Sequence, residues 1–441
     1  MAETNMAELI RLLDLRGQVI SADLVSQELP RAAIDIDSAL EEIRPLVAQI
    51  RAGGAQALLA IAQKFDGIDI NPIKVASEEL ASALRSLEPS LRASLEVAIE
   101  RVRKVTEQAK PKSFTTELAD GAQVQQRYQP IDSVGLYVPG GKAVYPSSVI
   151  MNVVPAQVAG VKKLAIATPG QKEFGGRAHP TVLATAALLG VEDVYVIGGP
   201  SAVIAFAYGI PEIGLEPVNL VTGPGNLYVA AAKRLLRGVI AIDSEAGPTE
   251  VMVIADSSAN PDFVAADLIS QAEHDEFAAA VLLTDSLEFA EKVSSAMTSQ
   301  AAGTSNQARV LTALSGQQSA IVLVFDLAQA AEIADFYATE HLELQTRSNE
   351  HLLGQISNAG AIFVGDFSPV SLGDYLAGSN HVLPTGGQAR FGSGLGVHTF
   401  LRPQQVIKYS ESALSEVANN VVAIADSEGL QAHGDAIRIR F

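Results

Sequence analysis

The 441-residue sequence contains no cysteine. This absence excludes disulfide bonds, thiolate nucleophiles, iron–sulfur clusters and every zinc site built from cysteine. A metal ion bound by this chain must therefore be held by histidine, aspartate, glutamate or carbonyl-oxygen ligands.

The sequence also has few charged residues and no concentrated positive charge. Only 18% of the residues are charged, and 31 Lys and Arg against 50 Asp and Glu give a formal net charge of −19. No basic run is longer than Lys162-Lys163 or Lys233-Arg234. Because an acidic surface repels phosphate backbones and anionic lipids, nucleic-acid and membrane partners are disfavoured.

Long hydrophobic segments are equally scarce. The longest uncharged stretch, residues 143–161, is long enough to cross a bilayer, but prolines and polar residues interrupt it. The N-terminal residues show no apolar segment followed by a small-residue cleavage site, so we expect no secretory signal and a cytoplasmic protein. At roughly 100 to 200 residues per domain, the length allows two to four domains.

The first part of the sequence is typical of helices and the middle part of alternating strands and helices. Up to about residue 130, apolar residues such as Leu9, Leu12 and Leu13 recur at three- and four-residue steps. From Val134 onward, β-branched runs alternate with alanine-rich helices, which predicts two α/β domains in tandem with parallel sheets. The predicted strands are Val134 to Val138, Lys163 to Thr168, Asp193 to Ile197, Val218 to Val221, Val239 to Ile242, Glu250 to Ala255, Ala279 to Leu283, Ala320 to Phe325 and Ala361 to Val364.

The last part of the sequence is poor in regular structure. Residues 365–396 are glycine-rich and loop-like, and a loop of this length is more often functional than not. The final 45 residues offer one helix, from Ser410 to about Gln431, and a terminal strand from Ile437 to Phe441. Because this piece is too small to fold alone, we expect it to dock elsewhere, including on another subunit.

Several polar residues are candidates for chemistry. Gln271 and His274 lie three residues apart on a predicted helix, so they are either a pair of metal ligands or a polar helix terminus facing water. Asp374 and His381 occupy the glycine-rich loop, where either residue could also form an Asx turn or a helix cap. His433 follows the last helix, where a solvated histidine would complement the helix dipole.

An acid–base pair and two glycine-rich turns complete the candidates. Glu340-His341 is a general-base candidate with an adjacent carboxylate; the alternative is an exposed charged pair before a strand. Residues 223–226 (GPGN) follow a predicted strand and open a helix, and residues 135–141 (GLYVPGG) form a second glycine-rich edge. Both suit anion or nucleotide binding, although a plain turn remains open for each. The dinucleotide fingerprint G-x-G-x-x-G is absent.

Seven segments of the sequence carry a resemblance to a known family. In chain order they are GLYVPGGKAVYPSSVIMNVVPAQVAGV, GPGNLYVAAAKR, AGPTEVMVIAD, DLISQAEH, TEHLEL, GDYLAGSNHVLPT and EGLQAH. Together, from about residue 30 to the C-terminus, they resemble the histidinol dehydrogenase family. The resemblance implies NAD-dependent, four-electron oxidation of L-histidinol to L-histidine through L-histidinaldehyde, at the end of histidine biosynthesis, with one Zn²⁺ per subunit.

The resemblance also implies roles for individual residues. The zinc ligands would be Gln271, His274, Asp374 and His433. The catalytic pair would be Glu340 and His341, with His341 taking the alcohol proton and Glu340 a proton from the water that attacks the aldehyde. The substrate contacts would be Thr249, Gln271, His274, His341, Asp374, His381, Glu428 and His433. The NAD contacts would be Tyr137, Ser201 and Asn226.

The implied architecture has two tandem Rossmann-like parallel-sheet domains, an N-terminal helical segment and a small C-terminal dimerisation segment. Residues 1–31 would be the helical segment. Residues 32–136 and 253–395 would form the first α/β domain, carrying most of the zinc site, and residues 137–252 the NAD-binding second domain. Residues 396–441 would complete the partner subunit's site in a homodimer.

Two positions depart from the family pattern. Ser201 stands where the family usually has glutamine, and Thr249 where it usually has serine, so that the hydroxyl is kept with an added methyl group. These departures leave open a related zinc- and NAD-dependent dehydrogenase of another small polar alcohol. A zinc hydrolase or a non-catalytic metal-binding protein is the third possibility, in which Glu340 would only activate water.

Overall fold

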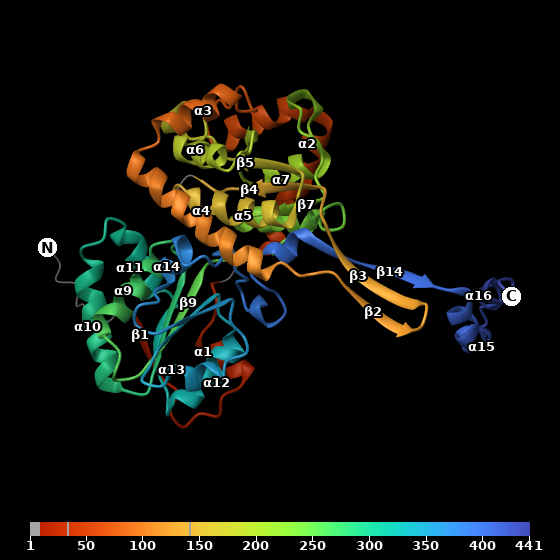
Figure 1. Ribbon diagram of the computed structural model, residues 1–441. Coiled ribbons are helices and arrows are strands. Elements are labelled where there is room, and N and C mark those ends of the chain that lie inside the picture. The colour runs from red at the N-terminus through yellow and green to blue at the C-terminus, as the bar shows by residue number, and fades with distance from the viewer. Residues whose placement is uncertain (1–8, 33–34, 141–142) are drawn as a thin grey trace.

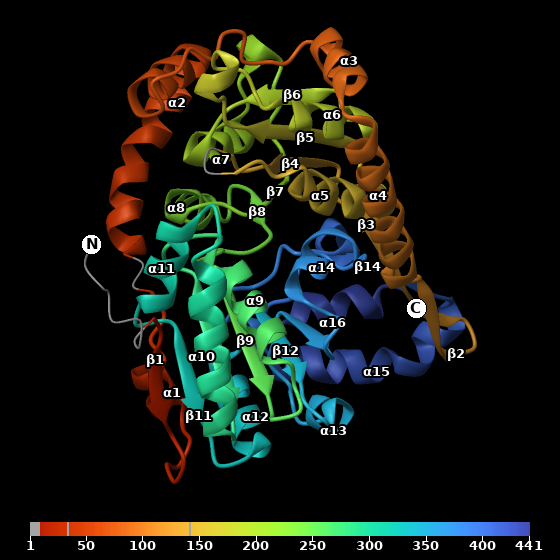
Figure 2. The ribbon, with the colours of Figure 1, turned by 90° about the vertical axis from the view of Figure 1, so that its left-hand side faces the viewer.

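The computed structural model describes residues 9–32, 35–140 and 143–441. These residues form two stacked α/β bodies and an arm that extends to one side of them (Figure 1). We call the bodies after their central strands, the β4 body and the β9 body. Figure 2 shows the same stack turned by 90°, with the β4 body above the β9 body.

The β9 body is built on a parallel sheet with the strand order β1-β11-β10-β9-β12-β13. The strands are β1 (Arg11–Asp14), β9 (Glu250–Ala255), β10 (Ala279–Thr284), β11 (Ala320–Leu323), β12 (His341–Gln345) and β13 (Ala361–Val364). One face packs against α9 (Pro261–Ala272), α10 (Leu287–Ala301) and α11 (Gln307–Ser315), and the other against α1 (Ala22–Glu28), α12 (Leu327–Tyr337) and α13 (Asn349–Leu353). Burial on both faces explains the continuous apolar runs of β9 and β10.

The β4 body is built on a second parallel sheet, in the order β6-β5-β4-β7-β8. Its strands are β4 (Ser133–Tyr137), β5 (Lys163–Thr168), β6 (Asp193–Val196), β7 (Leu220–Thr222) and β8 (Ala241–Ile242). Its helices are α2 (Ile36–Phe65), α3 (Ser77–Ser86), α4 (Pro89–Ala109), α5 (Pro146–Ala159), α6 (Pro180–Leu188), α7 (Gly199–Tyr208) and α8 (Leu227–Leu236). The strand order is that of a doubly wound sheet, in which ligands bind where the order reverses, here between the carboxyl ends of β4 and β7.

The arm joins two distant parts of the chain. Strands β2 (Phe114–Ala119), β3 (Ala122–Pro130) and β14 (Leu401–Tyr409) form an antiparallel sheet in the order β14-β3-β2. Helices α15 (Glu411–Ser427) and α16 (Gln431–Arg438) follow at its far end, next to the C-terminus (Figure 1). Shorter elements are α14 (Val370–Tyr375) and the 3₁₀ turns η2 (Lys172–Phe174), η3 (Pro211–Ile213), η4 (Gln388–Arg390) and η5 (Val397–Phe400).

The α/β class and the parallel sheets are confirmed, and β5, β9 and β13 have the predicted bounds. The predicted domain boundaries differ from the structure. Residues 39–102 pack in one apolar cluster with the β4 sheet and not in the clusters of the β9 sheet, because their apolar helix faces cover the β4 sheet. The predicted N-terminal helical segment contains β1, an edge strand of the other sheet, and its residues 1–8 lie outside the described residues.

Three further expectations about secondary structure were wrong. The first 130 residues are not uniformly helical, because β2 and β3 form a hairpin that leads into the arm. The single helix predicted from Ser410 is two helices, since Gly429 adopts a left-handed conformation (φ 70°) between them. The predicted terminal strand from Ile437 is instead the last two residues of α16 and three residues after it, because its alternating sequence finds no strand to pair with among the described residues. No helix in these residues is long and apolar enough to cross a membrane.

Candidate active site

A cavity of about 620 Å³ lies between the two bodies. The β4 body contributes residues of α4 and of the start of α5, which follows the carboxyl end of β4. The β9 body contributes His274 and Asp374. The amino-terminal edge of the β9 sheet therefore faces the carboxyl-terminal edge of the β4 sheet across the cavity.

Glu340 and His341 lie at the amino end of β12, beside the start of β9. The backbone of Glu250 contacts both side chains. Its N–H donates to Glu340 Oε2 at 2.9 Å, and its carbonyl oxygen lies 3.0 Å from His341 Nδ1. The hydroxyl of Thr249 also donates to Glu340 Oε2. The adjacent pairing of β9 and β12, with His341 opposite Val251, sets this geometry.

The contact with Glu250 selects the tautomer of His341. A carbonyl oxygen can only accept, so Nδ1 must carry the proton and Nε2 is left as the basic nitrogen. Nε2 is buried and has no hydrogen-bond partner in the described part of the chain. Burial lowers the pKa of His341, which keeps the ring neutral and able to accept a proton. This is the state that a general base requires.

The pKa of Glu340 shifts in the direction opposite to that of His341. Burial raises its pKa to about 8, against the lowering effect of the hydrogen bonds from Thr249 and the Glu250 amide. Its carboxyl group lies close to His341, with 3.5 Å between Glu340 Oε2 and His341 Nδ1. Burial thus shifts the two pKa values in opposite directions, upward for Glu340 and downward for His341, as is common among catalytic residues.

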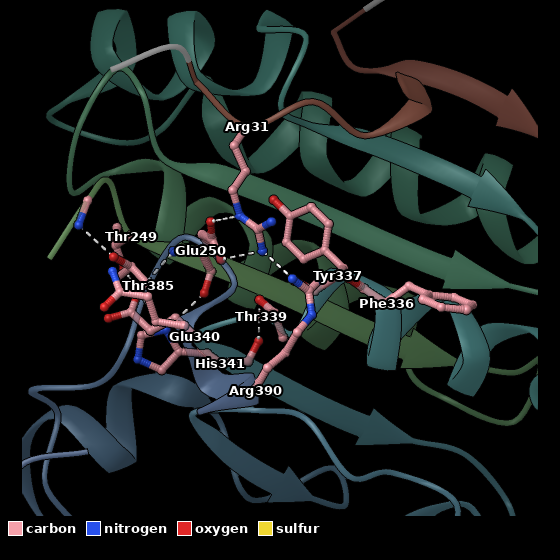
Figure 3. A network of polar contacts seen from close by, with 12 residues as sticks. Arg31, Thr249, Glu250, Phe336, Tyr337, Thr339, Glu340, His341, Thr385 and Arg390 are labelled. Carbon is pink, nitrogen blue, oxygen red and sulfur yellow. Dashed lines mark hydrogen bonds and ion pairs between the residues drawn. The ribbon is translucent and has the colours of Figure 1, made fainter. Parts of the chain in front are cut away.

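An ion pair between Arg31 and Glu250 supports the catalytic pair, because the backbone of Glu250 binds both Glu340 and His341 (Figure 3). The guanidinium of Arg31 donates to both carboxylate oxygens of Glu250, at 2.5 and 3.3 Å, and its carbon lies 3.9 Å from the centre of the Tyr337 ring. It also donates to the carbonyl oxygen of Tyr337. Sequence reasoning missed Arg31 and Glu250, although a glutamate inside an otherwise apolar strand (EVMVIA) is a signal that could have found them.

Two of the predicted metal ligands, His274 and Asp374, line this cavity, and Gln271 lies at the end of the adjoining helix α9. The helix α9 ends at Ala272, so His274 follows it in a turn and does not share a helix with Gln271 as predicted. The Gln271 amide nitrogen donates to the Thr249 hydroxyl, whereas its oxygen Oε1 is buried without a hydrogen-bond partner among the described residues. His274 Nε2 lies 3.9 Å from Asp374 Oδ2.

These residues fit a metal ion but do not complete its coordination. Ligands about 2.0 to 2.2 Å from one zinc ion lie about 3 to 4 Å apart, which matches the His274–Asp374 separation. The unpartnered Oε1 of Gln271 is a third available donor, and burial lowers the pKa of His274 towards its neutral, ligating form. Yet no group of three or more His, Cys, Asp or Glu side chains that could hold a metal occurs in the described ranges.

The other predicted substrate contacts divide between the body and the arm. His381 lies near His341 and His274; burial lowers its pKa to about 4, and its Nε2 has no partner among the residues described. Glu428 and His433 lie at the end of α15 and in α16, are exposed, and are far from the cavity of the same chain (Figure 1).

The predicted NAD contacts lie at the carboxyl edge of the β4 sheet. Tyr137 ends β4 and is buried, and its hydroxyl accepts the N–H of Gly199 at 3.0 Å, two residues before the buried Ser201. Asn226 is exposed and caps α8, accepting the N–H groups of Tyr228 and Val229. The predicted glycine-rich edge at residues 135–141 ends at Gly141, which is outside the described residues.

The GPGN turn is held in place by its own buried ion pair. A side chain at Gly223 would meet the Tyr137 carbonyl oxygen at 2.0 Å, so only glycine brings the turn this close to β4. Lys233 donates to Asp243 and to the carbonyl of Gly223, both at 2.6 Å, and Asp243 accepts the Gly223 N–H at 2.8 Å. The turn therefore presents a fixed backbone at the switch point of the sheet, which suits a nucleotide.

These features define a two-domain α/β enzyme with a buried acid–base pair beside an interdomain cavity that is lined by oxygen and nitrogen donors for a metal. Residues 29–441 match the sequence family described as histidinol dehydrogenase. The chain belongs to the histidinol dehydrogenase family, whose members are oxidoreductases that generally depend on NAD and zinc.

Individual relatives agree over nearly the whole length. The chain is 54% identical over 432 residues to the histidinol dehydrogenase of Leifsonia xyli subsp. xyli, covering 98% of this chain and 99% of that protein. It is 53% identical over 441 residues to that of Nocardia farcinica, covering 99% of each. The crystal structure of histidinol dehydrogenase from Elizabethkingia anophelis matches with a TM-score of 0.91 and 31% identity, over 98% of both chains. The matches do not favour a dehydrogenase of another alcohol, a hydrolase or a non-catalytic protein.

Proposed function

We propose that the chain oxidises L-histidinol to L-histidine through L-histidinaldehyde, in two steps that each reduce one NAD⁺, as the last steps of histidine biosynthesis. The observation that carries the proposal is the buried Glu340–His341 pair beside the donors Gln271, His274 and Asp374. We place the protein in the cytoplasm.

Each residue of the pair has one proton transfer to perform. In the first step a hydride leaves the alcohol carbon, and His341 Nε2 takes the hydroxyl proton because that nitrogen is basic and unpartnered. Water must then add to the aldehyde before a second hydride can leave. Glu340 takes a proton from this water at Oε1, because Thr249 and the Glu250 amide hold Oε2.

A zinc ion would be held by Gln271, His274, Asp374 and a further ligand, and would supply positive charge that orients the substrate and stabilises developing negative charge. The substrate contacts would be Thr249, Gln271, His274, His341, Asp374, His381, Glu428 and His433. Thr249 keeps the hydroxyl that links Gln271 to Glu340, so it orients a metal ligand and a base together.

Two NAD⁺ molecules would bind in succession at the switch point of the β4 sheet, and each would accept one hydride. Tyr137 ends β4, Ser201 lies in the first turn of α7 after β6, and Asn226 caps α8 after β7, so all three lie at the carboxyl edge of the sheet. Of the three residues, the exposed Asn226 is the most accessible to a ligand. Tyr137 and Ser201 are buried and would act indirectly, by positioning the start of α7.

The missing ligand would come from a second copy of the chain in a homodimer. Within α15 and α16 only Ala413, Ala425 and Gly434 are buried, so these helices form no core of their own. Large apolar side chains are exposed here, among them Ile424 of α15 at 61% and Ile439, directly after α16, at 84%. In a dimer, this apolar face would be covered, and Glu428 and His433 would reach the partner's cavity.

The proposal is tested by product stoichiometry and by the two proton-transfer residues separately. L-Histidinol should yield two NADH per molecule, with no free aldehyde trapped by semicarbazide. Glu340→Gln should stay impaired when histidinaldehyde is supplied directly, because water must still be activated. His341→Asn should lose most of the alcohol step. One NADH per substrate, with trapped aldehyde, would contradict the four-electron reaction.

A further inference from the structure

The face of β12 that begins with His341 carries a buried polar row. Side chains alternate along a strand, so His341, Glu343 and Gln345 point to the same face, and all three are at most 4% exposed. The proposed reaction uses only the first of them. Three buried polar residues in a row are costly unless each one is hydrogen-bonded, so the other two require an explanation.

Glu343 is bound through both of its carboxyl oxygens. Oε1 accepts the backbone N–H of Val370 at 3.0 Å, and Oε2 accepts the Gln345 amide at 2.8 Å. The same amide nitrogen donates to Asp267 Oδ2 at 3.0 Å. The carboxyl groups of Glu343 and Asp267 are also hydrogen-bonded to each other.

A hydrogen bond between two carboxyl groups requires that one of them keeps a proton. Burial, and then the charge of Asp267, raise the pKa of Glu343 well above its usual range. No ion pair joins either carboxyl group to a basic residue in the described ranges. The pair therefore shares one proton and carries a charge of about −1.

The pair connects the elements that carry the proposed metal ligands. Asp267 lies on α9 one helical turn before Gln271, and His274 follows the end of that helix. Val370 is the first residue of α14, which carries Asp374 one turn later and has no side-chain cap of its own. Glu343 thus supplies the acceptor that fixes the start of α14 to β12, while Asp267 fixes α9 to the same point.

We infer that Glu343 and Asp267 are positioning residues, which hold α9 and α14 on β12 so that Gln271, His274 and Asp374 converge on one metal ion. The inference deepens the proposed function and rests on it for the identity of the ion. The geometry makes Glu343 the central residue, because it alone contacts both Asp267 and α14.

Two matched variants distinguish this role from simple burial of polar groups. Asp267→Asn and Glu343→Gln each leave the pair with one negative charge and nearly the same volume. Asn at 267 can donate to Glu343 and still accept from Gln345, so every hydrogen bond survives. Gln at 343 offers one acceptor oxygen where two N–H groups need separate oxygens, so one bond must be lost.

The readout is the zinc affinity of the full-length chain, measured by competition with a chelator. Asp267→Asn should stay within about threefold of the unsubstituted chain, whereas Glu343→Gln should bind zinc at least about tenfold more weakly, as second-sphere substitutions do. In Glu343→Gln, kcat should fall while the KM for NAD⁺ is unchanged, because the β4 body is untouched. Equal affinities for the two variants would overturn the inference.

Val370 gives an independent test if Glu343→Gln does not fold. Val370→Pro removes the N–H that Glu343 accepts, together with the valine side chain, at a helix position and after an extended residue (Pro369 ψ 156°) where proline is tolerated. Val370→Ala controls for the lost side chain. We expect Val370→Pro to weaken zinc binding about tenfold more than Val370→Ala, and equal affinities would reject the role of Glu343.

Amide hydrogen exchange separates this inference from the proposed function. In metal-free protein, residues 371–375 should exchange faster in Glu343→Gln than in Asp267→Asn, because only the first variant loosens the start of α14. Equal exchange in both would overturn the inference whatever the zinc result. Failure of the unsubstituted chain to bind zinc or to oxidise L-histidinol would instead reject the proposed function.

Discussion

In the β9 body, Glu340 and His341 are buried and held by hydrogen bonds, and His274 and Asp374 line one cavity, whereas the arm holds Glu428 and His433 on exposed helices. The contact with the Glu250 carbonyl has already set the tautomer of His341, and burial has raised the pKa of Glu340, without any ligand. The arm has no comparable core and fixes neither of its two residues. The difference teaches that the body is organised for catalysis by folding alone, and that the arm contributes only where another surface covers it.

The largest expected effect comes from removing the arm's helices. A chain ending at Tyr409 keeps β14 paired with β3 but loses Glu428 and His433. We expect activity to fall by at least about 10³-fold, because the metal site lacks a ligand, while the bodies stay folded by circular dichroism. Sedimentation should show monomers. Full activity of the truncated chain would mean that the body is complete by itself.

The second prediction separates chemistry in the body from metal binding by the arm. His341→Asn should lower kcat by about 10² to 10⁴, since it removes a positioned base, yet leave zinc content unchanged. His433→Asn should lower both zinc content and activity. Metal analysis of the two purified variants beside their kinetics provides the measurement. Loss of zinc from His341→Asn, or its full retention in His433→Asn, would break the proposed division of roles.

The third prediction concerns the ion pair behind the catalytic pair. Arg31→Gln leaves the carboxylate of Glu250, whose side chain is 4% exposed, without its cation, and we expect a loss of about 2 kcal/mol in unfolding free energy with about a tenfold drop in kcat. Arg16→Gln, which breaks the exposed pair with Asp14, should change stability by less than about 0.5 kcal/mol.

A double variant tests whether the unpaired charge of Glu250 causes the loss of stability in Arg31→Gln. Arg31→Gln with Glu250→Gln removes the stranded charge and should recover part of the lost stability, because a neutral amide is cheaper to bury. Denaturant melts of the single and double variants measure this. No recovery in the double variant would show that Arg31 acts by packing on Tyr337 instead.

The smallest expected effect is a pH dependence from Glu340. Burial raises its pKa to about 8, and only the carboxylate form accepts a proton, so aldehyde oxidation should speed up as the pH rises. Between pH 7 and 8.5 the increase is at most about eightfold, and less if a bound cation lowers the pKa. Glu340→Gln should lose this rise. A rate that falls across the same range would contradict the role of Glu340 as the base.

Local sequence patterns predict the strands well where they are apolar, and poorly elsewhere. The bounds of β5, β9 and β13 follow from continuous apolar runs. In contrast, the sequence indicates a strand after Glu340-His341 but not the bounds of β12, because its alternating His341, Glu343 and Gln345 look like an exposed segment. The arm's hairpin and the packing of residues 39–102 on the β4 sheet depend on contacts between distant segments, which no local period reveals.

The residues of the candidate site could be identified from the sequence, but their spatial arrangement could not. Residue chemistry and the family resemblance indicated Glu340 and His341, and the structure brings them together with Gln271, His274 and Asp374. The tautomer of His341 depends on the carbonyl of Glu250, and hence on the pairing of two strands ninety residues apart. Arg31 was missed because its partner lies in another part of the chain.

The central claim is that each active site combines the body of one chain with the arm of another. Asp374→Ala and His433→Ala chains, each inactive alone, should be unfolded together and reassembled. Random pairing makes about half of the dimers mixed, and each mixed dimer has one pocket with both lesions and one with none. Activity should therefore recover to about one quarter of that of the unsubstituted protein. Chains that demonstrably mix but recover no activity would contradict the shared site.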